Sequence, residues 1–302
     1  MSGNRMIRTA AGTRSESFGP AEWGLVSFLA LTWGASFLFI DIALDSLSPG
    51  VITWLRAALG ATALTLIPAA RGPVDSQSWP QIVLLGFTWI AVPFTLFPLA
   101  QQWIDSSLAG ILNAAMPLFA AAIAAVLLRR LPSRIHVIGL LVGFGGVILV
   151  ALPSWGEETN AALGIILVLL ATLLYGFSVN IAVPLQQANG ALPVVLRAQV
   201  VAAVATLPFA VVGLGESSFT WSGAGAVFVL GVFGTGVALA VMASLVGRVG
   251  ASRGGVAIYF IPIVAVILGV AFRDESIALL TVFGMVVVLA GAYLASRKEE
   301  AA

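Results

Sequence analysis

The chain has no cysteine and a single histidine among its 302 residues. These absences exclude disulfide bonds, thiolate catalysis and the common zinc sites that are built on cysteine or on several histidines. Two frequent hydrolase motifs, His-Glu-x-x-His and Gly-x-Ser-x-Gly, do not occur in the sequence either. We therefore expect a protein that is not an enzyme and that carries no metal and no cofactor.

Charge is scarce as well, because only 9% of the residues are charged whereas 60% are hydrophobic. A soluble domain carries roughly a quarter of charged residues to cover its surface. The composition therefore predicts an integral membrane protein, with the lipid bilayer as one partner. The net charge of +1 offers no basic surface for nucleic acid, and the sequence leaves the oligomeric state unknown.

Long apolar runs account for nearly the whole chain. A helix needs about 20 apolar residues to cross a hydrocarbon core, and ten runs of about that length can be counted. They lie at residues 22–43, 50–70, 80–101, 106–128, 134–152, 162–184, 192–214, 221–246, 250–272 and 277–296. The connections are too short for a soluble domain. The predicted fold is an all-α integral membrane protein with ten transmembrane helices.

Basic residues gather on one side of this predicted topology. Eleven of them fall in the two tails and the even-numbered connections: Arg5, Arg8, Arg14, Arg71, Arg129, Arg130, Arg134, Arg248, Arg253, Arg297 and Lys298. The connections on the other side contain only Arg273. Because short loops rich in Lys and Arg stay in the cytoplasm, we expect both termini to be cytoplasmic in a multi-pass protein of a bacterial inner membrane.

The two halves of the chain repeat each other. Three residues of the first half recur in the second half at an offset of 145 residues: Pro117, Gly139 and Gly146 return as Pro262, Gly284 and Gly291. Since each copy holds five spans, the second copy enters the bilayer from the opposite side. The sequence thus predicts two inverted five-helix repeats, residues 22–152 and 162–296, between tails 1–21 and 297–302. Many secondary transporters share this plan, with a substrate site near the midplane.

The repeated prolines are predicted to break their helices. Pro117 and Pro262 lie near the middle of spans four and nine, where each leaves the carbonyl four residues earlier without its helical donor. Those carbonyls belong to Asn113 and Ile258. Broken helix at this depth is tolerated where it faces protein or a wet cavity. The prolines are therefore structural or gating candidates, packing alone being the alternative, and Asn113 is a candidate for the substrate pathway.

A second repeated motif supplies candidate pathway residues. Trp33-Gly34-x-Ser36 in span one is echoed by Tyr175-Gly176-x-Ser178 in span six. In each motif the aromatic ring and the hydroxyl lie three residues apart, hence on one helix face, and such a pair suits an amphipathic organic solute. Packing or interfacial anchoring is the alternative for the aromatics. Three further residues are candidates for the pathway: Trp89, Gln101 and Tyr259.

One arginine lies inside a predicted span. Arg56 is about two turns into span two, where a charged side chain is costly without a partner or water. Asp41 and Asp45, near the outer end of span one, are its expected partners. We therefore assign Arg56 and Asp41 a structural or gating role, while a snorkelling side chain or proton coupling through Asp41 stays open.

Taken together, these motifs resemble those of the drug/metabolite transporter superfamily, in its ten-span form with two EamA domains. The resemblance covers nearly the whole chain and rests on Trp33-Gly34-x-Ser36, Pro49 followed by Arg56, the central proline of span four and the glycine-rich fifth span. Arg129-Arg130 stand where many members place a glutamate, whereas the second half keeps Glu275. The resemblance implies outward transport of metabolites, and a similarity to an amino-acid exporter of this superfamily implies aromatic or other neutral amino acids.

The expected function is a secondary transporter that exports small neutral or zwitterionic metabolites by alternating access. No predicted span carries a carboxylate at mid-depth, which disfavours a cationic substrate. A multidrug exporter of the same superfamily is the alternative, and a channel is less well supported because no ring of charges or carbonyls repeats. Gly139-x-x-x-Gly143 and Gly250-x-x-x-Gly254 fit close helix packing, within the chain or between copies.

Overall fold

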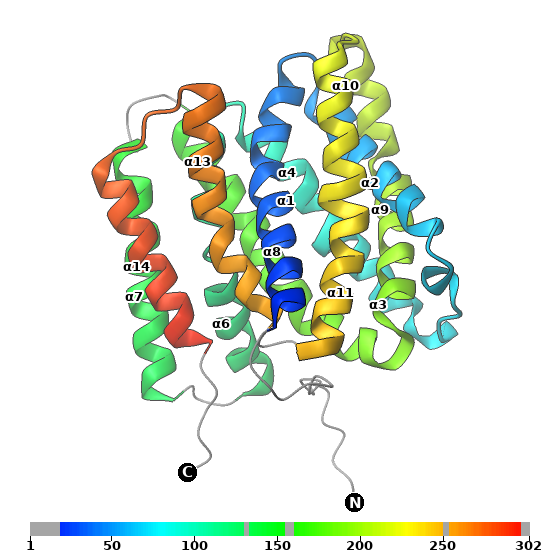
Figure 1. The fold of residues 1–302 in the computed structure, drawn as a ribbon, viewed down its shortest axis with the longest axis horizontal. Coiled ribbons are helices and arrows are strands. Elements are labelled where there is room, and N and C mark those ends of the chain that lie inside the picture. The colour runs from blue at the N-terminus through cyan, green and yellow to red at the C-terminus, as the bar shows by residue number, and fades with distance from the viewer. Residues whose placement is uncertain (1–18, 130–132, 155–159, 250–253, 297–302) are drawn as a thin grey trace, which may run out of the picture.

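The computed structural model describes residues 19–129, 133–154, 160–249 and 254–296, and within these ranges every regular element is a helix (Figure 1). Eight continuous helical segments are long and apolar enough to cross a membrane. The last helix, α14 (Leu279–Ala295), is apolar but shorter, and α2 (Pro49–Thr65) has 17 residues and contains Arg56. The chain thus crosses the bundle ten times, which confirms the predicted all-α membrane fold.

The ten crossings divide into two sets of five. The first set is α1 (Pro20–Leu44); α2; α3 (Trp79–Leu85), η3 (Gly86–Ala91) and α4 (Val92–Ala100) in one line; α5 (Ser106–Asn113) and α6 (Met116–Leu128); and α7 (Arg134–Ala151). The second set is α8 (Ala161–Asn189); α9 (Ala191–Gly213); α10 (Trp221–Phe228), η6 (Val229–Val237) and α11 (Ala238–Val249); η7 (Gly255–Phe260) and α13 (Ile261–Arg273); and α14. Short 3-10 turns, η1 (Pro68–Arg71), η2 (Ser76–Ser78), η4 (Leu152–Ser154) and η5 (Leu214–Glu216), lie in the connections.

The two ends of the bundle are easily told apart. The start of α1 and the end of α14 lie on the same face, at the bottom of Figure 1, and we call this the terminal face. The connections after α1, α4 and α13 lie on the other face, which we call the opposite face. The first set of five starts at the terminal face and the second at the opposite face, so the repeats are inverted.

Packing between the sets follows the same symmetry. Spans that correspond in the two repeats pack on each other: α2 packs on α9, α7 packs on α14, and span four packs on span nine through α5 and α13. Other pairs occur twice with the repeats exchanged: α1 packs on α13 as α8 packs on α6, and α2 packs on η6 as α9 packs on η3. Arg129 and Asp274, the two non-glycine residues of the described chain with positive φ, end α6 and α13 at equivalent positions 145 residues apart.

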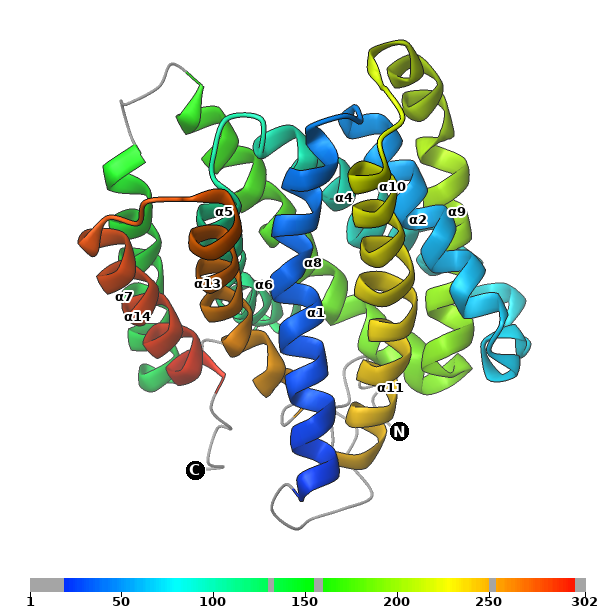
Figure 2. The same ribbon diagram turned by 45° about the horizontal axis from the view of Figure 1, so that its top comes forward.

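Repeated glycines bring α7 and α14 together. The two helices lie side by side in both views of the bundle (Figures 1 and 2). A Cβ atom at Gly139 would stand 2.6 Å from the Ala295 nitrogen, and one at Gly284 would stand 2.8 Å from the Val150 nitrogen. Backbone approach of this kind is the use of small residues in membrane helices. Gly139-x-x-x-Gly143 therefore makes a contact inside the chain.

Both central prolines mark interruptions of a helix. Two non-helical residues separate α5 from α6, and Pro117 is the second residue of α6. In the second repeat, η7 is a 3-10 helix, and α13 restarts with Pro262 as its second residue. Proline is well suited to this place, because the first turn of a helix needs no N–H donor. The predicted breaks are therefore present at both sites.

Wide π-helical turns interrupt two other spans. η3 and η6 are π-helical and occupy corresponding places in spans three and eight. Such turns are frequent at functional sites, because they shift the side chains that follow on the helix surface. Both turns border a cavity between the two repeats, to which η3 contributes Trp89 and η6 contributes Thr235.

Some sequence predictions lie outside the described residues. They are the tail 297–302 and most of the tail 1–21, the connection that contains Glu157, and Gly250 of the second glycine pair.

Candidate functional site

A cavity of about 340 Å³ lies between the two repeats. Its walls come from α1, α2, η3, α4, α8, η6 and α11 and from the two broken spans, α5 with α6 and η7 with α13, and the start of α9 completes the lining at the terminal face. Gln186 and Ala191, at the junction of α8 and α9, and Val246 and Gly255, at the junction of α11 and η7, are among its lining residues. The cavity therefore extends from the centre of the bundle to the terminal face.

Five of the eight predicted pathway residues line this cavity: Trp33, Ser36, Trp89, Asn113 and Tyr175. Trp33 and Tyr175 come from equivalent positions of α1 and α8. The glycines that follow them allow close packing: a Cβ atom at Gly34 would stand 3.0 Å from the Ile261 carbonyl, and one at Gly176 would stand 2.7 Å from the Ala120 nitrogen. Each motif thus packs its glycine on a helix that follows a proline break and turns its aromatic ring to the cavity.

Asn113 lies where the helix of span four is interrupted. It is the last residue of α5 and is 9% exposed, and its Oδ1 atom has no hydrogen-bond partner among the described residues. Pro117 has no N–H to donate to the Asn113 carbonyl. The break therefore gives the cavity wall polar acceptors at mid-depth, where an apolar helix would show none.

Arg56 places a positive charge in the same cavity. The residue is buried, with 7% of its surface exposed. Nε donates a hydrogen bond of 3.1 Å to the Thr235 hydroxyl, and the guanidinium carbon lies 3.8 Å from the centre of the Phe94 ring. The Thr235 hydroxyl in turn donates to the Leu230 carbonyl in the widened turn of η6. These contacts hold the guanidinium plane against one wall of the cavity.

The other three predicted pathway residues lie elsewhere. Ser178 is fully buried and donates to the Thr88 hydroxyl at 2.9 Å. The Tyr259 hydroxyl donates toward α14, to the Ala292 carbonyl and the Ser296 hydroxyl. Gln101 lines a second cavity, described next. None of the three is among the residues that line the central cavity.

The second cavity, of about 530 Å³, lies toward the opposite face and is lined mainly by polar side chains, among them Asp41, Gln101, Asp105, Arg273 and Glu275. Between the two cavities lies a buried apolar layer. Phe37 and Phe97 make an edge-to-face contact with ring centres 5.5 Å apart, and Phe97 lies 5.8 Å from Tyr175. Gln101 donates from Nε2 to the Phe37 carbonyl. The central cavity is thus closed on this side.

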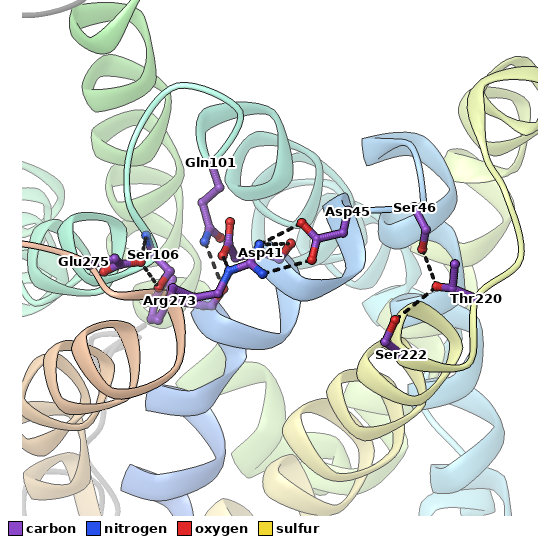
Figure 3. A network of polar contacts seen from close by, with 10 residues as sticks. Asp41, Asp45, Ser46, Gln101, Ser106, Thr220, Ser222, Arg273 and Glu275 are labelled. Atoms are coloured by element: carbon purple, nitrogen blue, oxygen red, sulfur yellow. Dashed lines mark hydrogen bonds and ion pairs between the residues drawn. The ribbon is translucent and has the colours of Figure 1, made fainter.

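A charged network lies above that layer (Figure 3). Arg273 at the end of α13 contacts Asp41 of α1 through Nε and binds both carboxylate oxygens of Asp45, at 2.8 and 2.9 Å. Bidentate pairing of this kind is among the stronger ion-pair geometries. Because α1 belongs to the first repeat and α13 to the second, the network ties the two repeats together at the opposite face.

Glu275 adds a second tie at this face. One carboxylate oxygen accepts from the Ser106 nitrogen and hydroxyl, at 2.9 and 2.6 Å, and the other accepts from the Ser107 nitrogen at 3.0 Å (Figure 3). The carboxylate therefore caps the N-terminus of α5, where a negative charge is favourable. The equivalent position of the first repeat, 145 residues earlier, is Arg130 in the sequence. A glutamate latch of this kind is thus encoded in one repeat and not in the other.

These contacts correct one sequence prediction. Asp41 and Asp45 bind Arg273 instead of Arg56, because the carboxylates lie at the opposite face while Arg56 lies deeper, beside Thr235 and Phe94. Sequence reasoning also missed Arg273 as a site residue. The signal that could have found it was present, since Arg273 is the single basic residue that the sequence predicts on that side.

The chain is similar to known membrane transporters. The EamA-like transporter family matches it twice, over residues 23–152 and 162–297. An uncharacterized transporter of Archaeoglobus fulgidus is 24% identical over 92% of this chain and 99% of its own. The uncharacterized inner membrane transporter YedA of Escherichia coli is 25% identical over 90% of this chain and 92% of its own.

Two further similarities are more distant. A protein of Streptantibioticus cattleyicolor named a probable terminal-alkyne amino-acid exporter is 22% identical over 92% of this chain and 94% of its own. A protein of known crystal structure superposes with a TM-score of 0.64 at 16% identity, covering 91% of this chain and 97% of its own, and so shares the fold. The two family matches account for most of the sequence, and the chain is a multi-pass membrane protein that belongs to the EamA-like transporter family within the drug/metabolite transporter superfamily.

Proposed function

We propose that this transporter exports small neutral or zwitterionic metabolites, with amino acids as the first candidates, by alternating access between its two faces. The observation that carries the proposal is the central cavity between inverted repeats, which reaches the terminal face and is closed toward the opposite face by Phe37 and Phe97 and by the Arg273 network. A pathway that is open to one side and closed to the other is what a carrier requires, and inverted repeats supply the means of exchanging the two sides.

The lining of the cavity supports an amphipathic organic solute. Trp33, Trp89 and Tyr175 offer aromatic surface, and Ser36 and Asn113 offer hydrogen-bonding groups. Aromatic walls with a few polar groups are typical of sites for small organic molecules. The name given to the relative from Streptantibioticus cattleyicolor, an amino-acid exporter, supports the same class of substrate.

A multidrug exporter is the second candidate. The width and largely apolar lining of the cavity favour it, because such a surface can accept varied hydrophobic solutes. The charges of the lining disfavour cationic drugs. Arg56 is positive, and none of the described residues that line the cavity is an aspartate or glutamate. A channel is less well supported, because the apolar layer separates the two cavities.

The membrane orientation is part of the proposal. The terminal face would lie in the cytoplasm of a bacterial cell and the opposite face outside, because eleven Lys and Arg residues of the sequence belong to the terminal side and one, Arg273, to the other. In this orientation the cavity between the repeats, proposed at residues 22–152 and 162–296, is open to the cytoplasm. Solute would enter it from the cytoplasm in the state that this structure shows. The name of the Escherichia coli relative places that protein in the inner membrane.

A counterflow screen tests the proposed function. Proteoliposomes would be loaded with one unlabelled solute from a set of amino acids, cationic drugs and nucleotide sugars, and the uptake of the same solute in labelled form would be followed. We expect transient accumulation above equilibrium for neutral amino acids, since a carrier exchanges solute across the membrane. Accumulation for cationic drugs alone would favour the second candidate, and equilibration without overshoot for every permeant solute would indicate a channel.

A further inference from the structure

We propose that Arg56 is the binding site for a carboxylate, so that the central cavity selects solutes that carry a carboxylate at one end and an aromatic or apolar body at the other. This inference rests on the proposed function, because it names the part of the transported solute that the cavity recognises. The inference also goes beyond the proposed function, because it states that the solute needs a carboxylate for binding and does not need an amino group.

Arg56 has unused hydrogen-bonding capacity. A guanidinium has five N–H donors. Within the described chain, Nε contacts Thr235, and no hydrogen bond or ion pair engages Nη1 or Nη2. The residue is 7% exposed and lines the cavity. Four donors on two adjacent nitrogens are therefore left for whatever occupies the cavity.

The charge of Arg56 is uncompensated among the residues that line the cavity. Arginine stays ionised in proteins, and a buried charge requires a partner or water. Three carboxylates at the opposite face bind other groups. Asp41 and Asp45 pair with Arg273, and Glu275 accepts hydrogen bonds at the N-terminus of α5. The cavity lining thus has one positive charge and, among its described residues, no negative one. An anionic group on the solute would supply the missing charge.

Two contacts hold the Arg56 side chain in one orientation. Phe94 covers one face of the guanidinium, 3.8 Å from the ring centre, and Thr235 fixes Nε. A guanidinium held in one plane presents two parallel N–H groups, which match the two oxygens of a carboxylate. The immobilised fork is thus prepared for bidentate binding before the solute arrives, so little side-chain entropy is lost.

The remaining polar groups explain why an amino group is tolerated but not required. Asn113 lines the cavity with a neutral amide, whose Oδ1 atom is buried without a partner among the described residues; after rotation of its side chain the amide can accept a hydrogen bond from an ammonium group or a hydroxyl. The Asn113 amide has no charge. It therefore cannot act as the anionic partner that an amine without a carboxylate would need in the cavity. The cavity should therefore bind a carboxylic acid without an amino group and reject an amine without a carboxylate.

Four probes separate these groups on one aromatic body: L-phenylalanine, phenylpropionate, phenethylamine and L-phenylalaninamide. Binding would be measured as the ligand-induced rise in the melting temperature of the purified full chain, and transport by counterflow in proteoliposomes. We expect the two carboxylates to bind at least about tenfold more tightly than the amine and the amide, which is a conservative value for a charge-assisted pair. This comparison uses the wild-type protein and depends on no variant.

Variants then assign the preference to Arg56. Arg56→Gln should weaken phenylpropionate binding by about tenfold or more and remove the preference for acid over amide, whereas Arg56→Lys, a point charge without the fork, should retain part of it. Arg71→Gln is the matched control, because Arg71 is exposed in η1 and is not among the residues lining the cavity. It should leave the preference intact.

The outcomes separate the two proposals. Equal binding of acid and amide by the wild-type chain, or an unchanged preference in a folded Arg56→Gln variant, would overturn the carboxylate site. If phenylalanine still shows counterflow in that case, the proposed function stands. If none of the four probes binds or shows counterflow while a solute of another class does, both the carboxylate site and the proposed function are overturned.

Discussion

Trp33 and Tyr175 occupy equivalent positions in the two repeats, and both rings border the same cavity. Their common position arises because the inverted repeats meet at the cavity, so each copy of the motif approaches it from its own side. An aromatic ring at such a place can bury apolar area of a solute while the cavity remains wide enough for passage.

We expect Trp33→Ala and Tyr175→Ala each to lower solute transport several-fold while expression and melting temperature stay near those of the wild type. The reason is that both rings border open space, so truncation removes solute contact without leaving a closed void. Counterflow in proteoliposomes is the measurement. Trp221→Ala is the control, since Trp221 is 85% exposed and is not among the residues that line the cavity. Wild-type rates in both test variants would mean that the two rings serve packing alone.

Arg273 is the second residue whose role is testable alone. We expect Arg273→Gln to weaken the closure of the opposite face, because it leaves Asp41 and Asp45 without their cation. A cysteine introduced at Gln101, in this naturally cysteine-free chain, should then react faster with a reagent that does not cross the membrane. The exchanged pair Asp41→Arg with Arg273→Asp should slow the reaction again, and unchanged labelling in the single variant would mean that the network does not hold this face closed.

At the scale of elements, α7 and α14 pack closely because glycines line one face of α7, which lets the two backbones come together. Gly145 and Gly146 are neighbours in sequence but point in different directions. A Cβ atom at Gly146 would stand 2.6 Å from the Val288 nitrogen, whereas one at Gly145 would have nothing within 4 Å. The interface therefore requires glycine at one position and tolerates a side chain at the other.

This contrast gives a matched pair of substitutions. Gly146→Ala should destabilise the protein by about 1 to 3 kcal/mol, because the added methyl group meets backbone that cannot move aside. Gly145→Ala should be neutral or slightly stabilising, since alanine is about 1 kcal/mol better than glycine in a helix. Melting temperatures in a common detergent would compare them. Equal effects would show that α7 and α14 do not pack through this face.

The proline breaks are the other feature at this scale. Alanine would restore the helical donor four residues after Asn113 or Ile258, the latter of which now accepts from the Ile261 nitrogen in a tighter turn, and would favour continuous helix across each interruption. Because the repeats are inverted, Pro117→Ala and Pro262→Ala should shift the balance between the two open states in opposite directions. Accessibility of single introduced cysteines near each end of the cavity measures that balance.

Pro208→Ala is the control for this experiment, because Pro208 also lies inside a helix, α9, but at an exposed position away from the breaks. It should leave the labelling pattern unchanged. Shifts in the same direction for Pro117→Ala and Pro262→Ala, in well-folded protein, would contradict a mechanism in which the two repeats exchange roles.

At the scale of the whole molecule, the inverted repeats give two faces with different ties. The Glu275 carboxylate caps α5 at the opposite face, while the sequence has Arg130 at the equivalent place of the other repeat. Together with the Arg273 network, this difference agrees with the observed state, in which the opposite face is closed and the cavity reaches the terminal face.

The orientation of the bundle can be tested by tagging. A tag inserted in the connection near Glu157 should be reached from outside the cell, because the proposed orientation places that connection opposite to the basic residues. A second tag after Ala302 should be reached only after permeabilisation. The reverse pattern would contradict the orientation, and access to both tags from one side would contradict ten crossings.

The sequence alone determined the class of fold, because a charge content of 9% and ten long apolar runs leave no alternative to a helical membrane protein. The sequence also revealed the internal repeat, because prolines and glycines recur at a fixed offset. Pro117 and Pro262 lie at the two helix breaks, and Gly139 and Gly284 lie where α7 packs on α14. These features depend on local chemistry that needs no knowledge of neighbours.

Only the tertiary structure decided which polar residues meet. Lipid and protein interior are both apolar, so the hydrophobic pattern of a membrane helix leaves its rotation about its own axis almost undetermined. For this reason Trp33 and Asn113 could not be told from Ser178 and Tyr259 by sequence, although the first two line the cavity and the others bind neighbouring helices. The partner of Asp41 was predicted wrongly as Arg56, because the sequence shows which side of the membrane a charge lies on but not which helices are neighbours; the packing of α1 on α13 brings Arg273 to Asp41.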